Sequence, residues 1–242
     1  MNLIIDIGNT QTKYALFKKN VMIEFRTSYD NDLDLISSWR EKYPETDSVI
    51  VSSVQLKPES FLDSLKMMFA RLIYFDQNTP TPLKNLYESK ATLGYDRLAA
   101  CVGAYVLYPN SNLLVIDAGT AITFDFVDAK NQYLGGAISP GLSMRFKALN
   151  EFTKKLPLLE KSDSCQLIGK NTSQAIISGV QNGLLFEMDT YINQIKEKHD
   201  NAKFFLTGGD ADFLSGKLQN RIETNKQLLL MGLNSILNYN CS

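Results

Sequence analysis

The sequence predicts an α/β protein made of two similar lobes, and three observations support this. The stretch LIIDIGNTQT at residues 3–12 is nearly repeated as LVIDAGTAIT at residues 114–123. The order of predicted strands and helices restarts at the second copy. A length of 242 residues with 44% apolar residues suffices for one large core or two small ones. We therefore expect a duplication, with lobes over residues 1–111 and 112–242.

The first lobe is predicted to run strand, strand, strand, helix, strand, helix. Short apolar runs rich in β-branched residues indicate the strands, with a turn at Lys18–Asn20. Helical spacing of apolar residues indicates the helices, and Pro58 stands where the second can begin. The strands are expected over 3–7, 12–17, 21–27 and 48–54, and the helices over 33–43 and 59–72.

A polar, proline-bearing connector at 77–89 leads to a helix over 95–108. That helix carries small residues, which suit close packing, at Ala99, Ala100, Gly103 and Ala104. The second lobe then repeats three strands followed by helices and a late strand. Its strands are expected over 113–118, 121–128, 132–138 and 202–209, and its helices over 141–152, 172–198 and 226–238.

An aspartate and a glycine end the first strand of each predicted lobe. Asp6 precedes Gly8 in one copy, and Asp117 precedes Gly119 in the other. In α/β lobes, ligands bind outside the carboxyl ends of the strands. Glycine permits a tight turn and a close approach to an anion. A third glycine turn, TGGD at 207–210, follows a later strand.

Polar residues after each aspartate can donate amides and hydroxyls to phosphate oxygens, namely Asn9, Thr10 and Thr120. A carboxylate beside phosphate needs a bridging cation, and Mg²⁺ commonly joins one or two carboxylates to phosphate oxygens. The pattern therefore predicts a site for a polyphosphate and a metal ion. The alternative for each D-x-G is a simple turn after a buried strand.

Composition argues against several other functions. The formal charge of −1 gives nucleic acid or an anionic membrane no electrostatic footprint, so we expect neither as a partner. The cysteines (Cys101, Cys165 and Cys241) are odd in number and widely spaced, which indicates a reduced, cytoplasmic protein. His199 is the single histidine and is expected near a helix end at the surface, so histidine-based catalysis is improbable.

Other nucleotide motifs do not fit. The sequence has no G-x-G-x-x-G. The stretch GKNT at 169–172 is not a phosphate-binding P-loop, because Ser164 stands where the upstream glycine belongs.

Five motifs occur in order: DIGNTQTK, GYDR, DAGTA, GGAISPGL and TSQAIISG. This ordered set closely resembles the type III pantothenate kinases, bacterial enzymes of the acetate kinase, hexokinase, Hsp70 and actin superfamily. The resemblance implies two ribonuclease H-like lobes with an ATP cleft between them. It also implies ATP-dependent phosphorylation of pantothenate, the first step of coenzyme A synthesis, by a homodimer that needs Mg²⁺ and either K⁺ or NH₄⁺.

The resemblance also implies site residues in this sequence. Asp96 in GYDR matches the general base and Arg97 a binder of the substrate carboxylate. Asp117 matches the ligand of the monovalent cation, and Asp6 would act through Mg²⁺. The ATP phosphates would contact Asp6, Ile7, Gly8, Asn9, Thr10, Gln11, Thr12, Lys13 and Thr120. Pantothenate would contact Tyr87, Gly94, Tyr95, Asp96, Arg97 and Thr172. Tyr95 departs from the family, which usually has a small residue there.

Alternatives remain open for several of these residues. Asp96 and Arg97 can be a surface pair that opens a helix, although an arginine there better suits an anion. Thr172 can cap the helix that follows it. Gly179 and Gly183 most simply serve packing within the lobe, and a dimer contact is the second hypothesis. The rival functions are another small-molecule kinase or phosphatase of the superfamily, and a non-catalytic nucleotide-binding regulator.

Overall fold

A computed structural model describes residues 1–55 and 58–241, and the chain divides into two compact units. Unit 1 comprises Met1–Pro109, Asn131–Tyr133 and Gln227–Ser242. Unit 2 comprises Asn110–Lys130 and Leu134–Lys226. The division differs from the expected ranges of 1–111 and 112–242 chiefly at the C-terminal end, where residues 227–242 belong with unit 1.

Unit 1 is built on a five-stranded sheet with the order β3-β2-β1-β4-β5. Strand β1 is antiparallel to β2 and parallel to β4. The strands are β1 (Asn2–Ile7), β2 (Thr12–Lys18), β3 (Val21–Ser28), β4 (Ser48–Ser53) and β5 (Arg71–Tyr74). The four expected strands are confirmed.

Strand β5 lies where the sequence predicted the end of a helix. That helix, α2 (Glu59–Met68), ends earlier, because Phe69 takes an extended conformation. The mostly apolar stretch from Met67 to Tyr74 does not reveal where the helix ends and the strand begins, because a short apolar run has no clear period. The other predicted helix, α1 (Leu33–Lys42), begins at Asp32, whose side chain accepts a hydrogen bond from the Leu35 N–H.

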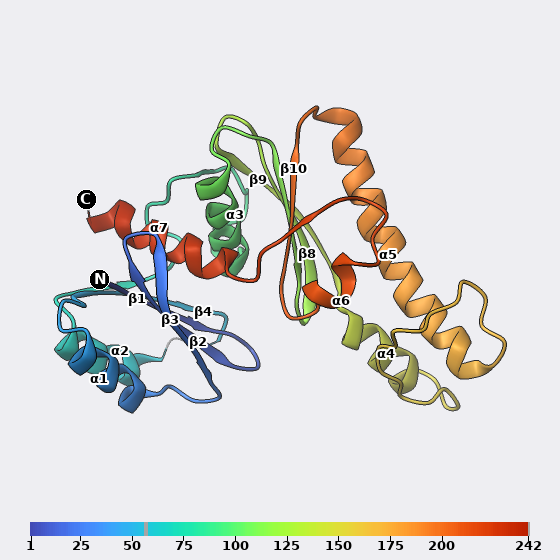
Figure 1. The fold of residues 1–242 in the computed structure, drawn as a ribbon, viewed down its shortest axis with the longest axis horizontal. Coiled ribbons are helices and arrows are strands. Elements are labelled where there is room, and N and C mark those ends of the chain that lie inside the picture. The colour runs from blue at the N-terminus through green and yellow to red at the C-terminus, as the bar shows by residue number, and fades with distance from the viewer. Residues whose placement is uncertain (56–57, 242) are drawn as a thin grey trace. The chain divides into compact units, whose positions relative to one another are not determined.

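Alternating residues of β1 point to opposite faces of the sheet. Leu3, Ile5 and Ile7 are buried in a core shared with residues of α1 and α2. Figure 1 shows these two helices beside the first sheet. On the other face, the Asn2 side-chain amide donates to Asn234 and Asn238 of α7 (Leu228–Cys241). Asp6 follows the same alternation and therefore faces away from α1 and α2.

Helix α3 (Tyr95–Leu107) packs closely on α7 in unit 1. A Cβ added to Gly103 would lie 2.0 Å from the Leu228 carbonyl oxygen, and one added to Gly232 would lie 1.8 Å from that of Ala99. The expected close packing of the small residues of α3 is confirmed, and its partner is the C-terminal helix. This contact explains why residues 227–242 belong with unit 1.

The sheet of unit 2 repeats the strand order of unit 1. The sheet has six strands in the order β11-β10-β7-β8-β9-β6, and the first five carry the repeat, with β7 antiparallel to β8 and parallel to β10. Read from the β9 end, these five follow the order β3-β2-β1-β4-β5 of the first sheet, which supports the duplication. The strands are β7 (Leu113–Ala118), β8 (Ala121–Val127), β9 (Gln132–Pro140), β10 (Lys203–Thr207) and β11 (Glu223–Thr224).

Short elements account for what the sequence analysis missed. Strand β6 (Lys84–Asn85) pairs with Gln132 and Tyr133 at the start of β9. The helix α6 (Ala211–Ser215), the 3₁₀ turn η1 (Lys90–Thr92) and β11 were also not predicted. Elements of two to five residues carry too few side chains to show a period.

One face of the second sheet is covered by two longer helices, which are α4 (Leu142–Glu151) and α5 (Thr172–Lys198) (Figure 1). Leu184, Met188 and Ile192 of α5 are buried with apolar residues of β7 and β8. The chain's one histidine, His199, caps the C-terminal end of α5, as expected. Within the described residues, every helix is too short or too polar to cross a lipid bilayer.

Candidate active site

The candidate residues fall into two groups, one in each unit. Unit 1 holds the loop from Asp6 to Lys13, with Tyr87 and the stretch from Gly94 to Arg97. Unit 2 holds Asp117, Thr120 and Thr172.

Asp6 is a buried carboxylate at the carboxyl end of β1. Its side chain is on the face opposite α1 and α2, and the residue is 4% exposed. Lys13 lies directly across on β2, with its Nζ 3.7 Å from an Asp6 carboxylate oxygen. Burial raises the pKa of Asp6 from 3.8 to about 6, and the Lys13 charge offsets part of this rise. Asp6 is thus a partly neutralised anion that a cation would stabilise further.

Asp96 lies close enough to Asp6 that its charge also raises the Asp6 pKa. It stands in the first turn of α3, where its Oδ1 accepts the Arg97 N–H at 2.9 Å. A Cβ on Gly94 would lie 2.6 Å from that oxygen, so glycine leaves room for the carboxylate. The loop of β1 and the start of α3 therefore bring two carboxylates together within unit 1, an arrangement suited to a cation and a proton acceptor.

Arg97 is a buried cation rather than half of a surface pair, since it is 6% exposed. Its guanidinium carbon lies 5.7 Å from the centre of the Tyr87 ring. Tyr87 in turn packs on Tyr133, with ring centroids 6.2 Å apart. The cation–π contact with Tyr87, a ring that packs on Tyr133, holds the guanidinium in a defined orientation, which suits two-point recognition of a carboxylate.

Tyr95, the departure from the family pattern, is the first residue of α3 and contacts Phe75 at a ring-centroid distance of 5.4 Å. Burial and the Asp76 charge raise the pKa of its phenol. The larger side chain thus packs against Phe75, which lies just before the connector.

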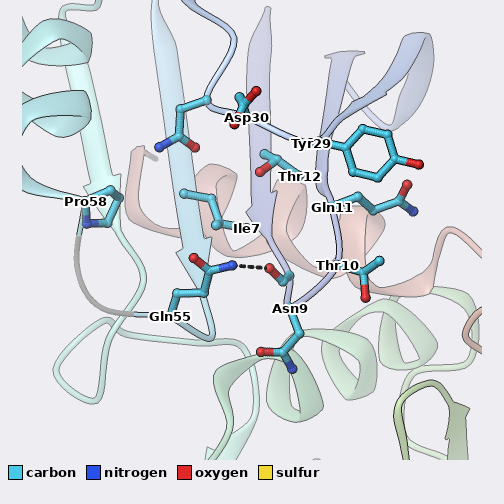
Figure 2. Close-up of a pocket in the computed structure, with 11 residues that line it drawn as sticks. Ile7, Asn9, Thr10, Gln11, Thr12, Tyr29, Asp30, Gln55 and Pro58 are labelled. Carbon is cyan, nitrogen blue, oxygen red and sulfur yellow. Dashed lines mark hydrogen bonds between the residues drawn. The ribbon is translucent and has the colours of Figure 1, made fainter.

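The loop between β1 and β2 lines a hollow of about 210 Å³ at the edge of unit 1 (Figure 2). The Gly8 N–H donates to the Gln11 carbonyl at 3.1 Å and closes the turn. The Gln55 side-chain amide, from beyond β4, donates to the Gly8 carbonyl at 2.7 Å. The hollow is lined by Ile7, Gly8, Asn9, Thr10, Gln11, Thr12, Tyr29, Asp30, Asn31, Gln55 and Pro58.

Asp6, Lys13 and Asp96 do not line this hollow. Ile7, which does, points to the opposite face of β1 from Asp6, because successive side chains of a strand alternate. The carboxylates of unit 1 therefore lie on the Asp6 face, while the loop residues from Ile7 to Thr12, which are the candidates for phosphate contact, line the hollow.

In unit 2, Asp117 is held against two glycine turns. A Cβ on Gly119 would lie 3.2 Å from the Asp117 Oδ1, and one on Gly208 would lie 2.5 Å from it. Gly208 has a φ of +96°, a backbone conformation that favours glycine. The Asp210 N–H donates to the Ala118 carbonyl at 3.0 Å, which ties the TGGD turn to the DAG turn.

Thr120 is exposed at the tip of the DAG turn, and its carbonyl oxygen would lie 2.1 Å from a Cβ on Gly141. The last glycine of GGAISPGL is therefore required for the close approach to this turn. Thr172 is the first residue of α5 and is exposed, while Asn171 supplies the cap by accepting the Gln174 N–H at 2.9 Å. The capping explanation for Thr172 is therefore wrong.

The two hairpins differ by one residue in their turns. Asp6 pairs with Lys13, whereas Asp117 pairs with Thr123. The repeat in the sequence sets Thr12 on Thr123, but the shorter second turn makes Thr123 the counterpart of Lys13 in the folded hairpin. Unit 1 thus sets an ammonium beside its aspartate, and unit 2 sets a hydroxyl there.

The side-chain oxygens at the two candidate sites are of the kind that Mg²⁺ and a monovalent cation prefer. The described residues contain no group of three or more histidine, cysteine or carboxylate side chains that could enclose a metal ion. Mg²⁺ bound with nucleotide needs fewer, since phosphate and water supply the other ligands. The Asp6 carboxylate suits that ion. The Asp117 carboxylate and the Thr123 hydroxyl are oxygen donors that suit a monovalent cation.

Sequence reasoning missed Ser52, Gln55, Thr123 and Tyr133, which contact or face the candidate residues. Ser52 pairs with Asp6, and Thr123 pairs with Asp117. Strand pairing and its register reveal these neighbours, and a single strand's composition does not.

Comparison with known proteins finds relatives along nearly the whole chain. The family model described as type III pantothenate kinase matches residues 2–194. A type III pantothenate kinase of Bacteroides fragilis is 44% identical over 240 residues, covering 99% of this chain and 98% of the relative. One of Flavobacterium johnsoniae is 40% identical over 241 residues, covering 99% and 98%.

Solved structures share the fold at low identity. A Campylobacter jejuni protein, provisionally described as a Baf family transcriptional activator, has a TM-score of 0.66 at 23% identity and covers 99% of this chain and 98% of its own. A polyphosphate/ATP-glucomannokinase of Arthrobacter sp. strain KM has a TM-score of 0.50 at 13% identity and covers 99% and 100%. The family match and the full-length relatives together show that this chain belongs to the type III pantothenate kinase family.

Proposed function

We propose that this chain transfers the γ-phosphoryl group of ATP to the primary hydroxyl of pantothenate and forms 4′-phosphopantothenate, the first step of coenzyme A biosynthesis. The observation that carries the proposal is the grouping of Asp6, Asp96 and Arg97 in unit 1: two carboxylates near each other, followed by a buried arginine. Phosphoryl transfer depends mainly on positioning and charge neutralisation, and these groups supply both.

Each group has a role in this proposal. Asp96 accepts the proton of the attacking hydroxyl, while the Arg97 guanidinium binds the pantothenate carboxylate beside Tyr87. Asp6 would hold Mg²⁺, which would neutralise the phosphate oxygens when bound. Residues Ile7 to Lys13 supply backbone and side-chain donors to the phosphates, as does Thr120, and Thr172 contacts pantothenate. Asp117 would hold K⁺ or NH₄⁺.

The test is formation of ADP by purified protein, measured with and without pantothenate and with K⁺ or Na⁺ as the monovalent cation. We expect ADP formation to require pantothenate, and ATP to bind more weakly when Na⁺ or Li⁺ replaces K⁺. ADP formation that ignores pantothenate but responds to a sugar or another alcohol in a substrate panel would favour a different kinase of the superfamily. Nucleotide binding without any turnover would favour a regulator.

We also propose a homodimer. Gly179 and Gly183 of α5 have open space around them, since an added Cβ would meet no atom of the described residues within 4 Å at either position. The expectation that they serve packing within the lobe is therefore wrong, and a second copy of the chain is the remaining hypothesis for this strip. Light scattering is expected to give twice the 27.2 kDa mass of one chain.

The cytoplasmic location is a separate prediction, which rests on the odd number and wide spacing of the cysteines.

A further inference from the structure

Ser52 is a fully buried hydroxyl in the same row of the sheet as Asp6. It lies on β4, is 0% exposed, and is paired in register with Asp6 on the parallel strand β1. Paired residues of neighbouring strands point to the same face and lie about 5 Å apart. Asp6 therefore has the Lys13 ammonium on one side and the Ser52 hydroxyl on the other.

The Ser52 hydroxyl has no hydrogen-bond partner among the described residues. Burying an unpartnered hydroxyl costs free energy, and alanine would fill nearly the same volume without that cost. Four buried side-chain atoms of the described residues share this property, and two of them, in Ser52 and Thr123, are strand neighbours of the D-x-G aspartates. A buried polar group left unsatisfied beside a candidate carboxylate calls for an explanation, and a functional role is one.

We propose that Ser52 is a positioning residue for Asp6. Its hydroxyl rotates about χ1 and donates a hydrogen bond to the Asp6 carboxylate when a magnesium nucleotide binds. One carboxylate oxygen would then accept from Ser52, which would leave the other available to a cation. The inference rests on the proposed function, because it takes Asp6 as the residue that holds the magnesium nucleotide.

The test compares Ser52→Ala with Ser48→Ala. Ser48 lies on the same strand and the same face, is also buried, and donates to an Asp47 carboxylate oxygen at 2.9 Å. Calorimetry would measure ADP affinity with Mg²⁺ and with EDTA, steady-state assays would give KM and kcat, and thermal unfolding would give Tm. Ser52→Thr restores the hydroxyl and serves as the rescue variant.

For Ser52→Ala we expect an unchanged or higher Tm and a loss of about tenfold in ADP affinity with Mg²⁺ but none with EDTA. The KM for magnesium ATP should rise by a similar factor, with a smaller change in kcat and none in the KM for pantothenate. Ser52→Thr should recover most of the loss, and Ser48→Ala should lower Tm and leave binding unchanged. Equal ADP affinity for wild type and Ser52→Ala, or a loss that is the same with EDTA, would overturn the inference.

Asp6→Asn separates this inference from the function on which it rests. If Asp6→Asn loses the Mg²⁺-dependent affinity and Ser52→Ala does not, only the role of Ser52 fails. If Asp6→Asn binds magnesium ADP as tightly as wild type, the proposed role of Asp6 fails first. In the Asp6→Asn background, Ser52→Ala should cause no further loss of affinity, because the acceptor charge is already absent.

Discussion

Lys13 and Asp6 face each other across two antiparallel strands, with the ammonium nitrogen 3.7 Å from a carboxylate oxygen. The Lys13 charge cancels only part of the effect of burial on the Asp6 pKa. Burial still raises the pKa of Asp6 to about 6 despite the Lys13 charge. A carboxylate that remains costly to ionise after pairing is suited to a second cation, and this relationship leads to two predictions about pH.

The first prediction is that Asp6→Asn stabilises the fold at neutral pH. Because the folded pKa lies above the unfolded value, the folded protein holds a proton between about pH 4 and 6 that the unfolded chain has released. The free energy of unfolding therefore falls as pH rises through this window. At pH 8 the variant should be more stable by up to about 3 kcal/mol, at 1.36 kcal/mol per pKa unit. Urea unfolding at pH 4, 6 and 8 measures this.

The control for that prediction is Asp63→Asn. Asp63 is an exposed carboxylate on α2 that pairs with Lys66, and its loss should change stability little at any of these pH values. An Asp6→Asn variant that is less stable than wild type at pH 8 would contradict the account.

The second prediction is that Lys13→Met moves the pH dependence of nucleotide binding. Removing the ammonium removes the charge that lowers the Asp6 pKa, so that pKa should rise above 6. Binding of magnesium ADP, which needs the ionised carboxylate, should then be lost at a higher pH than in wild type. Lys13→Arg keeps the charge and is the matched control. Titration calorimetry between pH 5.5 and 8 measures the shift, and identical pH profiles for Lys13→Met and wild type would refute it.

The third prediction is that Asp96→Asn lowers kcat by at least about 100-fold while nucleotide still binds, since Asp96 is proposed to accept the proton. Because the Asp96 charge raises the Asp6 pKa, the same variant should shift that pKa downward. Single-turnover phosphoryl transfer and ADP calorimetry separate the two effects. Turnover near the wild-type rate would exclude Asp96 as the proton acceptor.

The fourth prediction concerns Arg97 and the ring beneath it. Tyr87→Leu removes the cation–π contact with Arg97 and should raise the KM for pantothenate by about three- to thirtyfold, with little change in the KM for ATP. Tyr87→Phe keeps the ring and should behave as wild type. Equal pantothenate KM values for the Leu and Phe variants would show that the ring does not orient the guanidinium.

The fifth prediction contrasts two glycines. Gly232→Ala would place a Cβ 1.8 Å from the Ala99 carbonyl oxygen, so α7 must move away from α3, and a loss of about 2–4 kcal/mol is expected. Gly216→Ala, directly after α6 at a φ of −75°, meets no described atom within 4 Å and should stabilise the fold by about 0.4–1 kcal/mol. Chemical unfolding of both variants measures the difference. If Gly232→Ala lowers the free energy of unfolding by less than about 1 kcal/mol, α3 and α7 are not in close contact at this position.

Much of the fold follows from short-range signals in the sequence. The alternating and apolar runs predicted β1 to β4 and β7 to β10, and the helical period predicted α1 to α5 and α7, because burial of one face imposes a period on the chain. The two D-x-G turns identified the matching strand ends, since glycine and aspartate have few other reasons to stand there together. The ordered motifs identified the family.

Tertiary structure alone decided which residues share a site within each unit. The pairing of β1 with β4 sets Ser52 beside Asp6, and the shorter second turn sets Thr123, rather than a lysine, beside Asp117. The packing of α7 on α3 through Gly103 and Gly232 assigns the end of the chain to the first unit. Local sequence reports a segment's own period, whereas register and helix contact depend on partners far away in the chain, so only the folded structure reveals them.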